Sequence, residues 1–470
     1  MNKLERLPKD YTFGIELEFT GGLSYYETQS HIEALINKGL IREGWKVHFD
    51  RSVIDENGLG AEIVSPVLHD DEETEREIKI ITDFIKENGG VMSDKCGGHV
   101  HYGLQCLGTN IEHIKNFFKL YSIFEPLLYK LSTGDLDYVR PGCRDYAKPV
   151  QKRLTPVIDS KISSMSDLMA ILMANIGANA THYGAYRYYG LNIQRITEAI
   201  REKPDDMDLE EFLLKIFNGE EVIDKDGNAL SPTIELRFRN ASSDPEEILN
   251  GIRMGGQLFV AAKRDDLKDN EVIPTLYRHL KKLPSYVFDM VLSSDRTNPR
   301  YRDCKTDEEI LEKKFKLSEY GNGLIDESTF NCLFSILYPN MTKEEVRKLF
   351  IYYAKKIGMN IIEAEEKKEE RSRYSLTAFP RALKTFIKYY LSNKDPLISY
   401  QDILIKAENN RKPMVVNMDL RGLRNFILRH DIDIFNDNFR YKTDKEIYNT
   451  WKNAKEAYQK CLIFPALMTA

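Results

Sequence analysis

The chain has 470 residues, which favours two or three structural modules over one small core. A hydrophobic fraction of 42%, a charged fraction of 30% and a net charge of -6 at pH 7 are ordinary for a globular protein and create no field that would attract nucleic acid. No stretch approaches the ~18 uninterrupted apolar residues of a membrane span, and the N-terminus is charged where a signal peptide needs an apolar region. We therefore expect a cytoplasmic protein with no membrane anchor and no nucleic-acid partner.

Residues 11–20, Y-T-F-G-I-E-L-E-F-T, are predicted to form the first strand, because apolar and acidic residues alternate with a period of two. The alternation places Glu16 and Glu18 on the face opposite the apolar side chains. Taken alone, two such glutamates are most simply explained as solvent-exposed. A helix over residues 28–38 is expected to follow, with Gly39 ending it.

Two short strands, over residues 45–49 and 61–64, are predicted next, and Glu62 lies inside the second. A helix with an acidic first turn is predicted over residues 70–88. A second helix, over residues 110–130, carries apolar residues at helical spacing and is expected to pack in the core.

The segment K-C-G-G-H-V-H-Y-G-L, residues 95–104, lies between these two helices. On an extended strand His99 and His101 project from the same face, with side chains about 7 Å apart. That spacing suits a metal or phosphate site, and the flanking glycines would let a charged ligand approach the backbone. In isolation an H-x-H pair is more often two surface histidines. Residues elsewhere in the chain therefore have to show whether this pair forms a binding site.

Residues 138–153 form a local basic loop whose cations are Arg140, Arg144, Lys148, Lys152 and Arg153. Such a loop could bind phosphates or a carboxylate substrate, and a solvated run of charge explains it about equally well. Residues 182–192 are dense in tyrosine, as in a packed strand, and Arg187 is the residue that we single out there.

Residues 233–240, T-I-E-L-R-F-R-N, alternate again and predict a strand with Glu235, Arg237 and Arg239 on one face. Acid and base on one strand face could also be a surface salt bridge worth about 0 to 1 kcal/mol. A capped helix with proline in its first turn is expected over residues 244–262.

After about residue 265 the strand-like alternation largely disappears, and capped helices follow one another, such as those opened by Thr342 and Thr443. We therefore divide the chain into a module over residues 1–265 and a mostly helical C-terminal region over residues 266–470. The second region could shape a substrate pocket, form a homo-oligomer or bind a protein partner.

The polar residues of the predicted strands would converge if these strands were neighbours in one curved sheet. Four buried carboxylates would be prohibitively costly without compensation, and two divalent cations about 4 Å apart would neutralise them. Mostly oxygen ligands with one imidazole suit magnesium or manganese better than zinc, and the six cysteines lack the C-x-x-C pair of a structural zinc site. Such a site binds nucleotide phosphates. No G-x-x-x-x-G-K-[ST] loop is present, so ATP would be held by this sheet.

Five segments then resemble, in order, the motifs of the amidoligase family: F-G-I-E-L-E-F, E-I-V-S-P, C-G-G-H-V-H-Y-G, Y-R-Y-Y-G-L-N and T-I-E-L-R-F-R-N. That family belongs to the carboxylate-amine ligase superfamily with glutamine synthetase and glutamate-cysteine ligase. The resemblance covers about residues 11–262. It implies an α+β fold with a curved antiparallel sheet backed by helices, as in glutamine synthetase. It also implies ATP with two or more magnesium ions, and amide-bond formation through an acyl phosphate.

The resemblance also implies roles for single residues. The metal that bridges the ATP phosphates would be held by Glu16, His99 and Glu235. The metal nearer the substrate carboxylate would be held by Glu18 and Glu62, with a further acid that could be Asp50, Asp55 or Glu56. Phosphates and the charge that develops during the reaction would be contacted by His101, Arg187 and Arg237, the two arginines being the catalytic candidates.

The leading hypothesis is an ATP-dependent ligase that joins a carboxylate, from a small molecule or a peptide, to an amine. A phosphotransferase on the same scaffold is the first alternative, since guanidino kinases resemble this fold. A non-catalytic binding protein built on a ligase core is the second, and the intact set of acids and histidines argues against it. The sequence does not choose the substrates.

Overall fold

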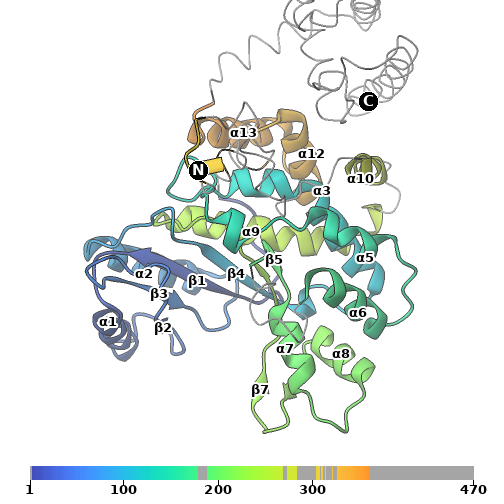
Figure 1. The fold of residues 1–470 in the computed structure, drawn as a ribbon, viewed down its shortest axis with the longest axis horizontal. Helices are drawn as coiled ribbons and strands as arrows, with labels where there is room; N and C mark the ends of the chain where they lie inside the picture. Colours follow the sequence, from blue (N-terminus) through green and yellow to red (C-terminus); the bar gives the residue numbers. More distant parts are fainter. Residues whose placement is uncertain are drawn as a thin grey trace, which may run out of the picture. The chain divides into compact units, whose positions relative to one another are not determined.

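The computed structural model describes residues 3–177, 188–267, 272–282, 303–306, 309–310, 313, 320 and 325–359. These residues form a six-stranded sheet, a separate two-stranded sheet and the helices that surround them (Figure 1). A compact unit is made of residues 1–280 and 287–359.

The six-stranded sheet is antiparallel between every pair of neighbours. Its order is β2 (Lys46–His48), β3 (Gly60–Val64), β1 (Phe13–Thr20), β4 (Gly98–Gly103), β8 (Thr233–Leu236) and β5 (Leu191–Asn192). The expectation of an α+β class with an antiparallel sheet backed by helices is confirmed, whereas the finer comparison with glutamine synthetase stays a prediction.

The two faces of the sheet differ as the alternation of β1 predicts. Phe13, Ile15 and Leu17 of β1 are each at most 2% exposed and face the core. On the opposite face, the register sets Glu16 across from His99 and Glu18 across from Glu62. In the same way His101 lies across from Glu235. Because directly paired residues share one face, the polar side chains of the central strands lie together.

Helix α9 (Pro245–Ala262) covers the apolar face of the sheet. The Tyr102 hydroxyl of β4 donates to the Ile252 carbonyl of α9 at 2.6 Å, and the Tyr102 ring lies 4.8 Å from that of Phe259. The start of α9 follows the prediction, because Asp244 caps it and Pro245 occupies the first turn.

Two more helices pack against α9, namely α2 (Glu72–Glu87) and α3 (Ile111–Leu131). A further layer is formed by α12 (Glu327–Leu337), which contacts both α9 and α3 and carries α13 (Lys343–Lys356) on it (Figure 1). The predicted capped helix at Thr342 is confirmed: its capping box with Glu345 forms and its expected apolar face is buried. The opposite, polar face of the sheet carries the candidate site.

The other described elements connect these layers. They are α1 (Tyr25–Asn37), η1 (Leu104–Cys106), α4 (Cys143–Tyr146), η2 (Gln151–Leu154), α5 (Thr155–Asp159), α6 (Met165–Ile176), α7 (Gln194–Glu202), α8 (Leu209–Asn218), β6 (Val222–Ile223), β7 (Ala229–Leu230), η3 (Asp265–Leu267) and α10 (Val272–Lys282). The helix predicted over residues 28–38 begins three residues earlier, because Ser24 and Glu27 form a capping box.

The prediction that Arg239 shares a face with Glu235 is wrong. Strand β8 ends at Leu236, so the alternation stops there, and the next pairing along the chain is a single bridge between Gly97 and Asn240. Arg239 is 5% exposed and lies over α9, where its Nη1 and Nη2 donate to the Ile248 and Glu247 carbonyls at 3.4 and 3.2 Å.

Several predictions fall on residues outside the described ranges, including Arg187 and the helix at Thr443. Of the strand predicted over residues 182–192, residues 191–192 form β5, and residues 182–187 are not described. The boundary near residue 265 stays a prediction. Among the described helices, none is long and apolar enough to cross a membrane.

Candidate metal and phosphate site

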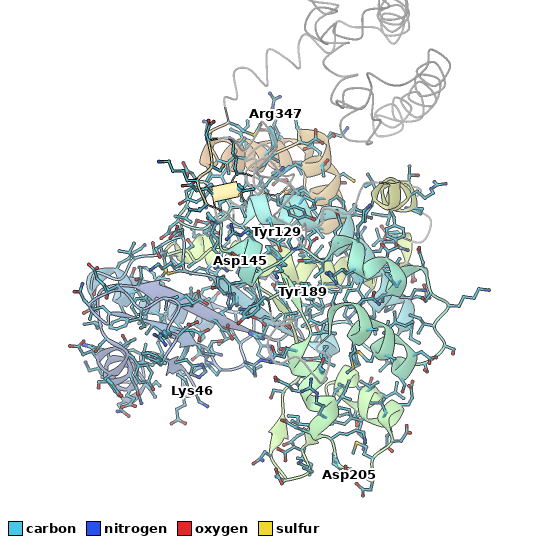
Figure 2. The ribbon with its side chains drawn as sticks, in the orientation of Figure 1. Lys46, Tyr129, Asp145, Tyr189, Asp205 and Arg347 are labelled. Carbon is cyan, nitrogen blue, oxygen red and sulfur yellow. The ribbon has the colours of Figure 1, made fainter. Side chains whose placement is uncertain are left out.

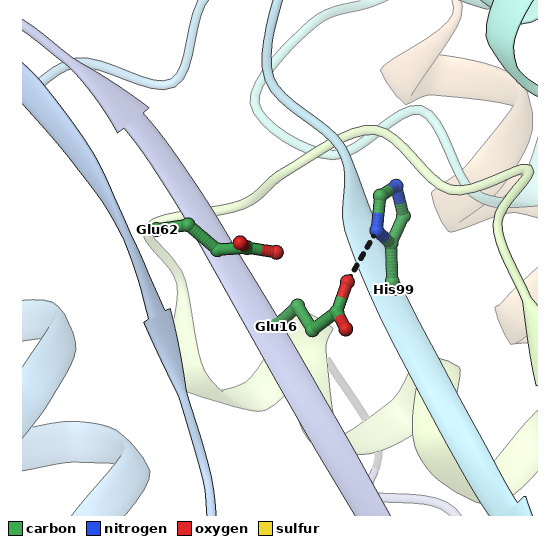
Figure 3. Close-up of side chains that lie close together, drawn as sticks. All are labelled: Glu16, Glu62 and His99. Atoms are coloured by element: carbon green, nitrogen blue, oxygen red, sulfur yellow. Dashed lines mark hydrogen bonds and ion pairs between the residues drawn. The ribbon is translucent and has the colours of Figure 1, made fainter. Parts of the chain in front are cut away.

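Acidic and histidine side chains from four neighbouring strands meet on the polar face of the sheet. Two groups of three residues could each hold a metal ion: Glu16, Glu62 and His99 in one, and Glu16, His101 and Glu235 in the other. The ligand atoms of each group lie within 4.8 Å of one another. Figure 3 shows the first group, with the Glu16 and Glu62 carboxylates directed toward the His99 side chain.

Glu16 is the residue that the two groups share, and its two oxygens face different histidines. Its Oε2 lies 2.7 Å from Nδ1 of His99, and its Oε1 lies 2.9 Å from Nε2 of His101. Each histidine also faces Glu235, whose Oε1 is 3.6 Å from Nδ1 of His99 and 3.8 Å from Nε2 of His101. Nδ1 of His101 lies 3.1 Å from the Thr233 hydroxyl, which holds the ring in place. Glu16 therefore belongs to both groups of residues that could hold a metal ion.

The ionisation of the site residues reflects an excess of carboxylates. Burial opposes the charge on Glu16, but hydrogen bonds from His101 and His99 outweigh it and hold the pKa of Glu16 well below its usual range. Glu62 shows the opposite shift: burial, followed by the charges of Glu16, Glu18 and Asp50, raises its pKa to about 9. At neutral pH a proton therefore sits on Glu62, and a bound cation would displace it.

Arg237 and Asn192 hold Glu235 from the side away from β1. Arg237 Nη1 donates to Glu235 Oε1, and Asn192 Nδ2 donates to Glu235 Oε2 at 2.7 Å. Burial would lower the pKa of Arg237, but the charges of Glu235, Glu16 and Glu18 raise it, so the guanidinium stays charged. Arg195 of α7 approaches from the rim, with its Nη2 3.9 Å from Glu16 Oε1 and its side chain 52% exposed.

Glu18 lies next to both groups but belongs to neither. Its Oε2 accepts a hydrogen bond from the Gly97 backbone, and its Oε1 lies 3.7 Å from His99 Nε2. Among the three further acids considered for the second metal, Asp55 uses one carboxylate oxygen to accept from Asn57 and Leu59 within its own turn. Asp50 is close enough to Glu62 to raise its pKa, which makes Asp50 the better candidate of these two.

The backbone of the predicted basic loop is joined to the sheet edge at Lys148. Lys148 pairs with the segment that leads into β5, since its amide donates to the Tyr188 carbonyl at 2.6 Å and its carbonyl accepts from Gly190 at 2.8 Å. Tyr189, labelled in Figure 2, bridges to Lys148, and Arg153 lies over its ring at 5.2 Å. Arg144 forms an ion pair with its neighbour Asp145, so the charge of this one arginine is compensated.

The structure groups the predicted residues differently from the assignments made by resemblance. Glu62 shares a candidate group with Glu16 and His99, while Glu18 lies directly across from Glu62 and outside that group. His101 lies within ligand distance of two carboxylates. Metal and phosphate binding by these residues stays a prediction. Asn192, Arg195 and Thr233 were not singled out from the sequence. Asn192 lies inside the Y-R-Y-Y-G-L-N segment and could have been noticed there, because an amide within a strand otherwise built of apolar residues needs a partner.

The donor set suits hard divalent cations. Each group offers two carboxylates and one imidazole, a composition closer to magnesium or manganese sites than to zinc sites, which prefer more nitrogen or sulfur. The five described cysteines are free thiols, and none belongs to either group.

Residues 9–202 match the sequence model of a family described as "Putative amidoligase enzyme". Over this segment the chain is similar to that amidoligase family. Its description indicates a ligase-type enzyme, and the match covers the strands that carry Glu16, Glu62 and both histidines. Glu235 and Arg237 lie beyond the matched amidoligase segment and are brought to it by the pairing of β8 with β4. No curated protein matches the chain.

Proposed function

We propose that the protein is an ATP-dependent ligase that forms an amide bond between a carboxylate and an amine through an acyl phosphate. The observation that carries this proposal is the sharing of Glu16 by two potential metal groups on one sheet face. The match of residues 9–202 to the amidoligase family model supports the reaction class. ATP and magnesium, with manganese as a substitute, are part of the proposal.

The residues present fit such cations on chemical grounds. The site gathers four largely buried carboxylates around two imidazoles and Arg237, and one carboxylate, Glu62, is neutral near pH 7 for want of positive charge. Divalent cations would supply that charge, bind the ATP phosphates and reduce the repulsion between phosphate and nucleophile. We propose that Glu16, Glu62 and His99 hold one of them and that Glu16, His101 and Glu235 hold the other.

The protein side chains would then act mainly by positioning and by charge. Arg237 is fixed by Glu235 and by a hydrogen bond from its Nε to the Tyr146 carbonyl at 3.5 Å, so its guanidinium is held at the edge of the site. From there it would offset negative charge on the phosphoryl group during transfer. Arg187 is proposed for the same task on the basis of the resemblance alone. Glu18 would anchor the Gly97 backbone beside the metals.

The test is nucleotide turnover with defined reactants. Purified protein with magnesium and ATP should release ADP and inorganic phosphate only when a carboxylate and an amine are both present. A stable phosphorylated product with no need for an amine would indicate a phosphotransferase instead. Absence of magnesium-dependent ATP binding would favour the non-catalytic alternative.

A matched pair of variants separates the site from the fold. Glu16→Gln with Glu235→Gln should weaken magnesium-ATP binding by at least about tenfold, because charged hydrogen bonds and ligands of this kind are worth 1.5–3 kcal/mol or more. Glu33→Gln, on the exposed face of α1, is the control and should change nothing. If the double variant binds magnesium-ATP as tightly as the parent, this face of the sheet is not the ATP site.

We expect the acid to be a small molecule or a peptide carboxylate and the protein to be cytoplasmic. The region after residue 265 could form a homo-oligomer or bind a protein partner. A structure with magnesium and a non-hydrolysable ATP analogue would bound the size of the acid through the space left beside the terminal phosphate.

A further inference from the structure

Arg140 is a buried arginine beside the site for which the structure provides no neutralising carboxylate. It is 3% exposed, and among the described residues no carboxylate oxygen lies within 4.0 Å of its guanidinium. Nη2 makes one long hydrogen bond, 3.5 Å, to the Arg237 carbonyl. Nε is buried without a hydrogen-bond partner. Polar groups buried in this way are rare and call for an explanation, the more so when they carry charge.

The guanidinium lies on the same face of the sheet as the site. A side chain added at Gly97 would place its Cβ 2.7 Å from Arg140 Nη2 and 2.6 Å from His99 Nε2. Those two nitrogens therefore flank the same point above the Gly97 backbone. A larger residue there would force the side chains of His99 and Arg140 to shift. Arg140 is thus next to His99, at the end of the site where Glu18 accepts from Gly97.

The backbone of Arg140 is held in place. Its amide donates to Asn240 Oδ1 at 3.2 Å, and Asn240 Nδ2 in turn donates to the Thr133 and Tyr138 carbonyls at 2.8 Å each. Asn240 closes the T-I-E-L-R-F-R-N segment, so the same stretch that supplies Glu235 also fixes Arg140. A charged group fixed in advance loses little conformational entropy when it binds a ligand.

Other buried arginines show what compensation looks like in this chain. Arg253 is 0% exposed and has carboxylate oxygens of Asp70 and Glu75 at 2.7 Å. Arg239 has no carboxylate partner, but both its terminal nitrogens bond helix carbonyls, and it lies on the apolar side of the sheet. The groups around Arg140 are His99 and the buried thiols of Cys96 and Cys143, and the Cys143 thiol interacts with the Arg140 side chain by a hydrogen bond.

We propose that Arg140 is an oxyanion-binding residue of this site and pairs with a ligand oxygen beside His99. The proposal rests on the function proposed above, in which two sources of that oxyanion exist: the carboxylate of the acid substrate and the phosphoryl group that is transferred. The planar carboxylate and the tetrahedral phosphoryl group both carry oxygens that a guanidinium binds through charge-assisted hydrogen bonds. Arg140 contacts the ligand, whereas Asn240 and Gly97 position it.

The experiment measures anion binding in the metal-loaded protein, without turnover. Inorganic phosphate and acetate are titrated separately into the parent, Arg140→Lys, Arg140→Met and the control Arg144→Met by isothermal titration calorimetry, and magnesium binding is measured in each. Arg144 lies on the same loop but already pairs with Asp145 at 2.6 Å. We expect Arg140→Met to weaken one of the two anions by about 10- to 100-fold, and Arg140→Lys by less, because lysine keeps the charge but loses the fork.

The two titrations distinguish the two possible sources of the oxyanion, and the magnesium measurement tests the proposed function separately. Selective loss of acetate binding assigns Arg140 to the acid substrate, and selective loss of phosphate binding assigns it to the phosphoryl group. Anion affinities that are the same in Arg140→Met, Arg140→Lys and the parent overturn the inference. If Arg140→Met does not fold, two other variants are measured, Arg140→Lys and Gly97→Ala. Binding of both anions that is unchanged in these two variants also overturns the inference. If the parent protein does not bind magnesium, the proposed function is rejected instead.

Discussion

Two clusters of buried charge, one on each side of the sheet, are built on opposite principles. On the apolar side Arg253 is bound by Asp70 through two hydrogen bonds of 2.7 and 2.8 Å and by Glu75 at 2.7 Å, and Glu75 also bonds Lys3 and Arg6. On the polar side, Glu16, Glu62 and Glu235 crowd around two histidines and Arg237. The first cluster neutralises its own charge, whereas the second has more carboxylates than cations.

The pKa values of one carboxyl from each cluster express this difference. Burial opposes the charge on Glu75, yet hydrogen bonds from Lys3, Arg253 and Arg6 lower its pKa to about 2. Burial and nearby negative charges raise the pKa of Glu62 to about 9. A carboxyl stabilised as an anion contributes to the fold, and one that retains its proton marks a place where positive charge is missing.

The largest effect is expected from breaking the compensated cluster. Arg253→Met removes the central cation and leaves Asp70, 1% exposed, without its ion-pair partner. Because a buried charge left unpaired is costly, we expect the free energy of unfolding to fall by about 3–5 kcal/mol, measured by urea denaturation. Magnesium affinity of the folded variant should be unchanged. A matching loss of magnesium binding would mean that the cluster around Arg253 and the cluster around Glu16 are coupled and do not act independently.

The next effect is expected from the shared carboxylate of the uncompensated cluster. Glu16→Gln removes a ligand from both potential metal groups, whereas Glu62→Gln and Glu235→Gln each remove a ligand from one. We expect Glu16→Gln to lower kcat/KM by about 10²- to 10³-fold, the range seen when one stabilising group is lost from an active site, and the other two variants to lose less. ADP release measured at a fixed magnesium concentration checks the order. Equal losses in all three variants would argue against a bridging role for Glu16.

The third prediction uses the opposite pH dependence of the two clusters. Since Glu62 must lose its proton to bind a cation, magnesium affinity should rise by up to about tenfold per pH unit up to about pH 9, with one proton released. Without metal, the folded state binds that proton more tightly than the unfolded chain, so stability falls as the pH rises from about 4.5 toward 9. The contribution of Glu75 has the reverse sign: it is present at neutral pH and is lost as the pH falls from 4.5 toward 2.

Calorimetry in two buffers of different ionisation enthalpy would count the released proton. The matched control is Glu62→Gln, in which metal binding should be weaker and should release no proton at this site. Proton uptake by the parent protein, or magnesium affinity that does not change between pH 6 and pH 9, would contradict the assignment of Glu62 as a ligand.

The polar face was predictable because a strand has a fixed period. Alternation in β1 and the two-residue spacing of His99 and His101 determine the face on which each side chain lies, whatever the neighbours are. The sequence could not provide the register, which depends on pairing between distant strands. The register is what sets Glu16 across from His99 and gives each histidine its carboxylates.

The errors come from places where the period ends or the signal is not local. Arg239 was placed with Glu235 because the alternation continues in the sequence, but the ladder stops at Leu236 and the chain turns toward α9. Asn192 and Arg195 reach the site from β5 and α7, and their approach depends on how residues 191–202 follow the sheet edge. The burial of Arg140 without a carboxylate partner could not be predicted from the sequence of the basic loop either.

The smallest effect, and the sharpest test of the charge argument, concerns Arg195 at the rim. Its side chain is 52% exposed and 3.9 Å from Glu16, so it offers a weak, solvent-screened counter-charge to the uncompensated cluster. If positive charge is what the cluster lacks, removing this cation should make a divalent ion bind slightly more tightly. We expect Arg195→Ala to raise magnesium affinity by less than about fivefold, the equivalent of an exposed ion pair worth up to about 1 kcal/mol, and the difference should vanish at high salt. A marked weakening of magnesium binding would show that Arg195 orders Glu16 and does not compete with the metal.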